Sequence, residues 1–479
     1  MEENKNVDAA EGVQEAAEIQ VEVKPRNKMA ISSVGKLIWK LGLPLIVSLV
    51  LQAVYNIVDT AFVINMGEDG VAGNLALTYA FPIQLLIIAV GVGTGVGVNA
   101  MLSKSLGEGN KQKADRVAGN GIFLAFVIYA VFLIFGIFGA GWFIRMQSGE
   151  NEQVAEMGAR YLQICCCLSF GTVGFTIYER FLQSTGRTLF STISQVSGAV
   201  LNVILDYVFI YPLGWGVEGA AWATVIGQAT SMGLAMLFHY LTNKEIGNHI
   251  KNLKPSWNII KEIYHIGLSA AIMQGLLSVM MLGVTLILGT AQDSVELLKG
   301  SFGIYYKIMQ FALFACFGLS NCIISVLAFN YGMQDKQRSK QCVKWGIIDT
   351  LIVSAIVTAL FEGLAEPLAN LFGMASGEGG EEITATVVTA IRISSIGYLF
   401  MGFSTAVQGV LQALRYALFP LIISALRLVV FVMPAVWLFT LTANPALTVW
   451  WAFPIAEVLT AAVSVPLLIF PYKKKLKEI

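Results

Sequence analysis

The sequence is poor in charge. Only 13% of its 479 residues are Asp, Glu, Lys or Arg, and the 31 basic side chains balance the 31 acidic ones. Charged residues make up about a quarter of an ordinary soluble domain. The zero net charge argues against a nucleic-acid partner, because proteins that bind polyanions carry an excess of basic residues. Since 56% of the residues are hydrophobic, the composition indicates a polytopic membrane protein.

Residues typical of enzyme and metal sites are also scarce. The six cysteines and three histidines do not show the spacing of a zinc site or of a disulfide framework. The sequence has no phosphate-binding loop of the form G-x-x-x-x-G-K-[S/T], and no extramembrane segment is long enough for a nucleotide-binding domain. A His or Cys nucleophile beside a base is missing as well. We therefore expect neither an enzyme activity nor a cofactor.

Long apolar runs, in contrast, are abundant. A membrane-spanning helix needs about 20 mostly apolar residues, and twelve runs reach this length. They centre on 37–64, 74–102, 117–144, 159–182, 189–211, 218–241, 259–289, 301–329, 345–372, 383–412, 417–440 and 447–470. The second run alternates glycine from Gly91 to Gly97, a spacing that suits close helix packing or a flexible bend. We predict an all-α polytopic membrane protein with twelve transmembrane helices.

The basic residues of the loops are sorted to one side of the membrane. Several Lys and Arg residues occur in each of three connections, 103–116, 242–258 and 331–344. Neither residue type occurs in three others, 65–70, 211–218 and 373–382. Because cytoplasmic loops are enriched in Lys and Arg, we place both termini in the cytoplasm. The Glu-rich segment 1–28 lacks the apolar core of a signal peptide and is predicted to be a disordered cytoplasmic tail.

The chain contains an internal duplication. An offset of 225 residues aligns three glycines of the first half with three of the second: Gly42 with Gly267, Gly93 with Gly318, and Gly107 with Gly332. Further along the chain the offset becomes 229, which a four-residue insertion explains. Each half holds an even number of spans, so the halves run in the same direction, as parallel repeats with the substrate path between them. We predict two pseudo-symmetric six-helix lobes, with the boundaries N-lobe 33–241, linker 242–258, C-lobe 259–470 and basic cytoplasmic tail 471–479.

A few polar residues lie inside the predicted spans, where an ionised side chain is costly and indicates a function. Asp59 lies in the first span, and Asn202 and Asp206, four residues apart, share one face of the fifth. Thr224 lies in the sixth span, and Tyr161 opens the fourth. Two carboxylates with nearby amide and hydroxyl oxygens suit a proton or a hard cation such as Na⁺. The alternative is that these groups only form hydrogen bonds between helices.

The second half carries different charged residues. Lys307 and Arg392 lie in the eighth and tenth spans, and Arg427 lies near the start of the eleventh. Asp349 and Glu457 lie in the ninth and twelfth spans, either deep or near a boundary. For Lys307, Arg427 and Glu457 we expect ion pairing, or snorkelling of the charged group to the membrane surface.

Several short motifs resemble the multidrug and toxic compound extrusion (MATE) family. In chain order they are Leu43-Pro44, Tyr55-Asn56 with Asp59-Thr60, Leu106-Gly107 with Gly109-Asn110, and Leu182-Gln183 with Gly186. The segment from Leu327 to Gly332 is similar to the bacterial branch that contains the staphylococcal multidrug export proteins. The resemblance covers about residues 33–470.

This resemblance implies efflux of drugs, including antibiotics, coupled to inward movement of H⁺ or Na⁺ by rocking of the two lobes. It implies a multi-pass protein of the bacterial cytoplasmic (inner) membrane. It also implies a cation site in the N-lobe, at the matching positions Asp59, Asn202, Asp206, Thr224 and Tyr161, with Na⁺ held by the first four if sodium is the ion. The resemblance is compatible with either H⁺ or Na⁺ as the coupling ion.

Two further features follow from the family pattern. Pro44 matches the proline at which the first span bends, and a proline there already lacks its helix hydrogen bond. Some relatives carry acidic residues in the seventh and tenth spans. This sequence has Gln274 in the seventh and no carboxylate between 383 and 412 in the tenth. The resemblance therefore does not extend to a coupling site in the C-lobe.

The cavity between the lobes is expected to bind bulky, flat and often cationic drugs. The candidate residues are Gln52, Tyr55 and Met281, followed by Met273, Met280, Phe81 and Phe175, because aromatic and Met side chains adapt to varied ligands. We expect small-molecule drugs and membrane lipids as partners, and a monomer. The alternative function is a flippase for lipid-linked oligosaccharides of the same superfamily. Its cavity would be strongly basic, and the candidates for that role are Lys307 and Arg392.

Overall fold

The computed structural model describes residues 27–149, 151–247, 250–291, 294–373, 380–475 and 477. These residues form helices connected by short loops, and the described part contains no β-strand. Ten of the described helices are long and apolar enough to cross a membrane, and the number is twelve when each of two bent helix pairs is taken as one span. The prediction of an all-α protein with twelve transmembrane helices is confirmed.

The N-lobe comprises the helices α3 to α10, preceded by the short α2. Their bounds are α2 Lys28–Ile31, α3 Val34–Ile64, η1 Gly67–Asp69, α4 Gly70–Gly107, α5 Lys111–Phe138, α6 Ala140–Ser148, α7 Glu152–Cys167, α8 Phe170–Ser184, α9 Thr188–Ile210 and α10 Gly216–Thr242. A single turn, η2 (Ile250–Leu253), lies in the connection to the second lobe.

The C-lobe comprises the helices α11 to α20. Their bounds are α11 Trp257–Leu288, α12 Val295–Gly332, α13 Lys336–Gly363, α14 Ala365–Gly373, α15 Gly380–Ser395, α16 Tyr398–Ala413, α17 Leu418–Ala425, the π-helical turn η3 Leu426–Phe431, α18 Val432–Thr440, α19 Pro445–Thr448, η4 Val449–Trp451 and α20 Ala452–Lys475. Of the tail predicted at 1–28, residues 1–26 lie outside the described part of the chain, and α2 begins at Lys28.

The helix bounds repeat between the lobes. Helices α4 and α12 have 38 residues each, and α5 and α13 have 28 each. Both pairs, and the short pair α6 and α14, start 225 residues apart (295 − 70, 336 − 111 and 365 − 140). The offset grows to 228 at α7 and α15 (380 − 152), so the extra residues of the second half enter between α14 and α15. The structure thus confirms the two parallel repeats.

Four predicted spans differ from the observed helices. The third and ninth runs each contain a break between two helices. Helix α5 ends at Phe138 and α13 ends at Gly363, before the short helices α6 and α14 begin. These short helices are apolar enough to extend a hydropathy window past the true end of the span. The fourth span is bent by 40° between α7 and α8, and the tenth by 54° between α15 and α16.

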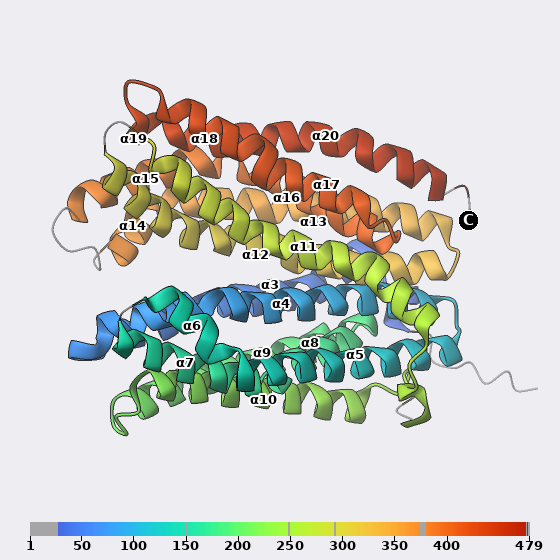
Figure 1. Cartoon of the computed structure of the whole chain (residues 1–479). Helices are drawn as coiled ribbons and strands as arrows, with labels where there is room; N and C mark the ends of the chain where they lie inside the picture. The colour runs from blue at the N-terminus through green and yellow to red at the C-terminus, as the bar shows by residue number, and fades with distance from the viewer. Residues whose placement is uncertain are drawn as a thin grey trace, which may run out of the picture.

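The two lobes lie one above the other, with α3 and α4 facing α11 and α12 (Figure 1). Alternating glycines allow α4 to lie between two helices. A Cβ atom at Gly95 would lie 3.1 Å from Arg180 Cγ of α8, whereas one at Gly93 would lie 2.6 Å from the carbonyl oxygen of Gly267 in α11. Residues 91 and 95 thus face the N-lobe, and residues 93 and 97 face the C-lobe. The predicted role of these glycines in close helix packing is confirmed.

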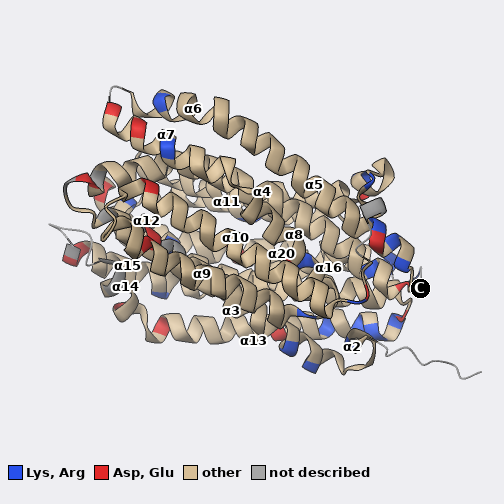
Figure 2. Ribbon diagram, turned by 90° about the horizontal axis from the view of Figure 1, so that it is seen from below, with Lys and Arg blue, Asp and Glu red and all other residues tan. Residues whose placement is uncertain are grey.

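Charged residues mark the two ends of the helix bundle. Figure 2 shows most Lys and Arg residues at the end that carries α2 and the C-terminus, which we call the basic end. At the opposite end two of the arginines have acidic partners. Arg160 lies 2.8 Å from both Glu156 and Glu218, and Arg392 lies 2.9 Å from Glu366.

The lobes are joined in the half of the bundle nearer the basic end. The Trp39 indole Nε1 donates a hydrogen bond to Asp349 Oδ1 (3.0 Å), which links α3 to α13. The Ser325 hydroxyl of α12 donates to Asn99 Oδ1 of α4 (3.1 Å). Arg338 donates to the main-chain oxygens of residues 29 and 32, at 2.9 Å each. This end is therefore closed, and a cavity between the lobes lies deeper in the bundle.

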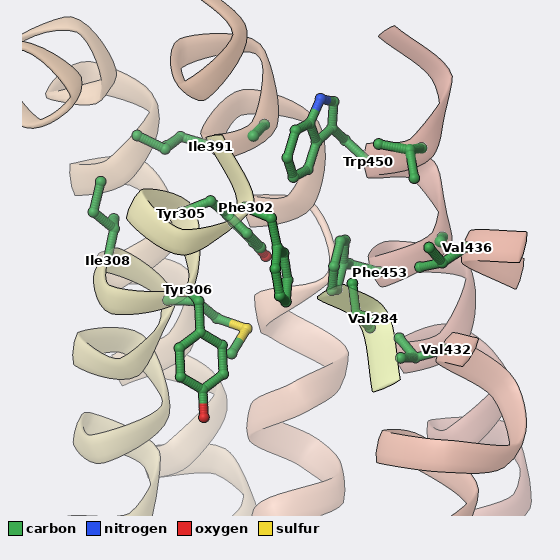
Figure 3. Packing of buried hydrophobic residues seen from close by; sticks show 14 of the residues in the cluster. Val284, Phe302, Tyr305, Tyr306, Ile308, Ile391, Val432, Val436, Trp450 and Phe453 are labelled. Atoms are coloured by element: carbon green, nitrogen blue, oxygen red, sulfur yellow. The ribbon is translucent and has the colours of Figure 1, made fainter. Parts of the chain in front are cut away.

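An aromatic cluster forms the C-lobe core. Phe302 and Tyr305 of α12 pack against Trp450 of η4 and Phe453 of α20 (Figure 3). Trp450 and Tyr305 have no exposed surface. This cluster anchors α20, and with it Glu457, against the long central helix α12.

Candidate functional site

Two carboxyl groups meet inside the N-lobe. Asp59 of α3 and Asp206 of α9 lie within hydrogen-bonding reach of each other. Asp206 is fully buried, and neither of its oxygens has a hydrogen-bond partner among the described residues; the same holds for Asp59 Oδ1. Two acidic groups this close cannot both carry a full charge unless a cation or a proton compensates them.

Asn202 lies one helical turn from Asp206 and adds an amide to this pair. Its side chain is 3% exposed, and neither its oxygen nor its nitrogen has a hydrogen-bond partner in the described part of the chain. Asn202 packs against Gly227 of α10, where a Cβ atom would lie 2.8 Å from the Asn202 Cβ. Thr224, one turn earlier on α10, is half-buried. The structure therefore brings Asp59, Asp206 and Asn202 into one site and places Thr224 on the helix that covers it.

Hydroxyl and amide groups surround the carboxyl pair. Tyr161 of α7 is buried, and its hydroxyl accepts a hydrogen bond from Gln84 Nε2 (3.0 Å). The Tyr55 hydroxyl accepts one from Gln228 Nε2 (3.3 Å). Both phenols lie close enough to Asp59 for an electrostatic interaction with its carboxyl group. Sequence reasoning missed Gln84 and Gln228, because a single amide in an apolar run has no distinctive pattern.

The donor set of this N-lobe site fits a small hard cation. Asp59, Asp206 and Asn202 offer oxygen atoms that are buried and without hydrogen-bond partners, and Na⁺ prefers oxygen ligands. Unpartnered buried polar atoms are rare in native proteins, because each carries a desolvation penalty of about 1–3 kcal/mol. A proton shared between the carboxyl groups would also satisfy the pair. No group of three or more His, Cys, Asp and Glu side chains that could hold a metal ion occurs among the described residues, so the site depends on the two carboxyl groups and the Asn202 amide.

A second site is the central cavity, which lies between the lobes and has a volume of about 130 Å³. Gln52 and Leu49 of α3 line it from the N-lobe, and Met273 and Gln274 of α11 line it from the C-lobe. Gln52 is positioned by a hydrogen bond that its Oε1 accepts from Gln195 Nε2 (2.9 Å).

Several candidates for the cavity lie elsewhere. Met281 is 38% exposed and is not part of the cavity lining, whereas Met280 is buried in the C-lobe core. Tyr55 belongs to the polar network around Asp59, and Phe175 is buried within the N-lobe. Phe81 is 52% exposed and lies outside the lining.

Two arginines line the central cavity, and one of them was missed from the sequence. Arg180 of α8 and Arg427 of η3 are each 4% exposed, and they are the charged members of the lining. Glu179 precedes Arg180, and the fourth apolar run contains both. The same rule that selected Asp59, a charge within an apolar run, could have found them.

The basic residues first considered for the cavity do not line it. Lys307 is exposed on α12. Arg392 is half exposed and pairs with Glu366 at the end opposite the basic end. The expected ion pair of Arg427 is confirmed, because its Nε lies 3.1 Å from Glu457 Oε1.

Pro44 lies inside α3, which continues as a helix from Val34 to Ile64. Its carbonyl oxygen accepts a hydrogen bond from the Thr192 hydroxyl of α9 (2.8 Å). A proline within a helix removes one main-chain hydrogen bond. The bond to Thr192 ties this weakened part of α3 to the helix that carries Asp206.

The fold and the two sites define a class: a polytopic helical membrane protein built from two six-span repeats, with a buried carboxyl pair in one lobe and a cavity between the lobes. The sequence model of the MatE family matches residues 44–208 and 269–438. These ranges cover most of both lobes, and the chain belongs to this family.

Named relatives and solved structures agree with this assignment. Multidrug export protein MepA of Staphylococcus saprophyticus is 24% identical over 374 residues, which cover 78% of this chain and 81% of the relative. The protein of the same name from Staphylococcus aureus is 24% identical over 434 residues, covering 90% and 92%.

Among solved structures, an outward-facing MATE family multidrug resistance transporter of the MOP superfamily superposes with a TM-score of 0.88 at 22% identity, covering 95% of this chain and 99% of the other. A MOP superfamily transporter from Pyrococcus furiosus, described as having a binding pocket of reversed polarity, gives 0.84 at 23% identity, covering 94% and 98%. These structures share the fold of the chain.

Proposed function

We propose that this protein is a secondary active transporter that exports bulky, often cationic drugs in exchange for H⁺ or Na⁺, by rocking of its two lobes. The observation that carries the proposal is the buried pair of Asp59 and Asp206, which lies within the N-lobe and apart from the central cavity. The relatives named multidrug export proteins support the choice of cargo.

The energy of one cation is sufficient for this exchange. A cation that moves down a potential of about 100 mV releases about 2.3 kcal/mol, enough for a solute gradient of roughly 40-fold. The carboxyl pair belongs to α3 and α9, and α3 also contributes to the cavity. Charge compensation at Asp59 can therefore alter the packing of a helix that touches the cargo. In this proposal the basic end faces the cytoplasm of a bacterium, in agreement with the distribution of Lys and Arg.

Gradient-driven transport tests the proposal. We expect proteoliposomes that contain the full chain to move ethidium when a pH or a sodium gradient is imposed. Asp59→Asn and Asp206→Asn should each abolish this transport. Asp69→Asn, an exposed acidic residue at the end of the bundle, is the matched control and should transport normally. Wild-type transport by both cavity-remote variants, Asp59→Asn and Asp206→Asn, would rule out the proposed coupling site.

The variant Asn202→Ala distinguishes sodium coupling from proton coupling. An amide oxygen can bind Na⁺ but does not take up a proton near neutral pH. In a sodium-coupled protein, Asn202→Ala should raise the half-saturating Na⁺ concentration about tenfold, as expected for the loss of one ligand. In a proton-coupled protein, the same variant should leave the pH dependence of transport unchanged. Transport under separate sodium and pH gradients measures both.

A flippase for anionic lipid-linked oligosaccharides is the second candidate, and the arginines Arg180 and Arg427 in the cavity lining favour it. A flippase would move a fluorescent polyprenyl-diphosphate oligosaccharide between the leaflets of the proteoliposome membrane and would not transport ethidium. Protection of the lipid probe from a membrane-impermeant reductant measures this movement.

A further inference from the structure

We propose that the central cavity binds solutes that carry a carboxylate, held between Arg180 of the N-lobe and Arg427 of the C-lobe. The inference rests on the proposed transport function and specifies its cargo: organic anions, or zwitterions whose cationic part lies elsewhere in the cavity. Among the described residues that line the cavity, the charged side chains are these two arginines, and none is acidic.

Arg180 has donors that the protein leaves available. One of its Nη groups donates a hydrogen bond to Gln183 Oε1 (2.7 Å), whereas its buried Nε has no partner among the described residues. Within the same part of the chain, it forms an ion pair with Glu179 at 3.9 Å. That carboxylate also accepts hydrogen bonds from Gln183 Nε2 (2.9 Å) and from the Ser191 hydroxyl (3.4 Å), so it is directed toward α9. Arg180 therefore adds a positive charge to the lining of the cavity that Glu179 compensates only at a distance.

The backbone makes room for Arg180. Its Cγ and Nε lie 3.1 and 3.2 Å from the position that a Cβ atom would occupy at Gly95 of α4. A side chain at residue 95 would push the guanidinium group out of its place. The glycine thus leaves room for the Arg180 side chain between α4 and α8.

Arg427 is arranged in a similar way on the other lobe. Its Nε lies 3.1 Å from Glu457 Oε1, but the direction of the N–H group does not make a hydrogen bond. Glu457 lies behind the arginine and outside the cavity lining. Arg427 belongs to the π-helical turn η3, a rare geometry that occurs frequently at functional sites.

Neutral amides complete the polar part of the cavity. Gln274 and Asn321 line it, together with Gln408 and Gln412 of α16. Gln408 is held by a hydrogen bond from its Nε2 to the Ser424 hydroxyl (2.9 Å). Amide groups can donate to a carboxylate without opposing its charge. A guanidinium group binds a carboxylate through two parallel hydrogen bonds, and such charge-assisted bonds are about twice as strong as neutral ones.

A matched pair of dyes tests the proposal by equilibrium binding, without any ion gradient. Rhodamine 110 carries a free carboxylate, and rhodamine 123 is its methyl ester with the same flat cationic ring system. We expect the purified full chain to bind rhodamine 110 at least about tenfold more tightly than rhodamine 123, a difference of about 1.4 kcal/mol. Fluorescence anisotropy measures both affinities.

Paired substitutions remove the arginines while keeping the net charge of each lobe unchanged. Arg180→Gln with Glu179→Gln, and Arg427→Gln with Glu457→Gln, avoid a buried carboxylate without a partner. Each double variant should lose most of the preference for rhodamine 110 over rhodamine 123. Arg392→Gln with Glu366→Gln removes an ion pair outside the cavity and is the matched control, for which we expect an unchanged preference.

Equal affinity of the wild-type chain for the two dyes, including no binding of either, would overturn the proposal. So would a preference that persists in both arginine double variants when these elute as monodisperse protein. Neither result bears on the coupling site, because gradient-driven transport that depends on Asp59 and Asp206 is measured separately. Loss of that transport, conversely, would leave the binding preference as it is.

Discussion

Trp39 of α3 donates its indole N–H to the buried carboxylate of Asp349 on α13, at 3.0 Å. This hydrogen bond joins the two lobes near the basic end. The second oxygen of Asp349 has no hydrogen-bond partner among the described residues, so the indole is the principal polar contact of this carboxylate. In the proposed rocking of the lobes, opening of the basic end requires this contact to break.

Removing the indole donor should favour opening of the basic end. Trp39→Phe would leave Asp349 buried without a partner, and a buried unpaired polar group destabilises its state by about 1–3 kcal/mol. Cys322 reports on this opening, since its thiol is buried and lies 3.6 Å from the Ile38 carbonyl oxygen in the same interface.

We therefore expect a membrane-impermeant maleimide to label Cys322 several times faster in Trp39→Phe than in wild type, as measured by mass spectrometry of the Cys322 peptide. Trp437→Phe, on an exposed part of α18, serves as the control and should label at the wild-type rate. Unchanged labelling in Trp39→Phe would show that this bond does not hold the lobes together.

Arg338 should hold the N-terminal helix α2 against the C-lobe. Its guanidinium donates to the carbonyl oxygens of Met29 and Ser32, and to Asn330 Oδ1, at 2.9 Å each. Lysine keeps the charge but cannot present this planar set of donors. In Arg338→Lys we expect trypsin to cleave after Lys28 several times faster than in wild type, as followed by gel electrophoresis.

The control for this prediction is Arg116→Lys, an exposed basic residue of α5, the helix that corresponds to α13 in the other lobe. Its cleavage rate after Lys28 should match wild type. A rate for Arg338→Lys that also matches wild type would contradict the role of Arg338 as an anchor.

Gly93 should be intolerant of a side chain. A Cβ atom there would lie 2.6 Å from the Gly267 carbonyl oxygen and 2.6 Å from the Ala271 Cβ, so α4 and α11 would have to separate. Overpacking of this kind costs about 1–3 kcal/mol. We expect Gly93→Ala to lower the melting temperature and to slow transport.

Gly233→Ala is the matched control, because it lies in α10 with open space around its Cβ position. Alanine favours a helix by up to about 1 kcal/mol over glycine, so this variant should melt at the wild-type temperature or above. Equal melting temperatures for Gly93→Ala and wild type would mean that the lobes do not need this close approach.

Arg427 and Glu457 should depend on each other for stability. Removal of one partner from a buried ion pair destabilises a protein by about 3–5 kcal/mol, because the remaining charge is left uncompensated. Their side chains are 5% and 14% exposed. Arg427→Gln alone should therefore melt well below wild type, and adding Glu457→Gln should restore most of the loss. Thermal unfolding of the four proteins in a double-mutant cycle measures the coupling. Additive effects would show that the pair is not coupled.

Much of the fold could be predicted from the sequence. Spans of about 20 apolar residues have few alternatives to crossing a membrane as helices, since each main-chain polar group must be satisfied within its own segment. The alternating glycines from Gly91 to Gly97 predicted close packing of helices, because only glycine allows a neighbouring backbone to approach this closely. The helix breaks at 139 and 364 were not predicted, because apolar side chains continue past them.

The N-lobe site was predicted from chemistry alone. Asp59 and Asp206 stood out because a carboxylate in an apolar span is costly, and the structure brings them together with Asn202. The roles of Tyr161 and Thr224 as ligands stay predictions, as does the identity of the ion. The cavity arginine Arg180 was missed although the same rule applied to it.

The sequence by itself determined the class of this protein: the number of spans, the duplication, and the sorting of charge between the two ends. Each follows from local composition or from periodicity, which the chain carries without reference to its folded shape. Only the tertiary structure decided which charges face the central cavity. Arg180 and Arg427 come from different lobes, and their carboxylate partners lie outside the lining of the cavity. That arrangement depends on helix rotation and on packing between distant segments, and no local pattern encodes either.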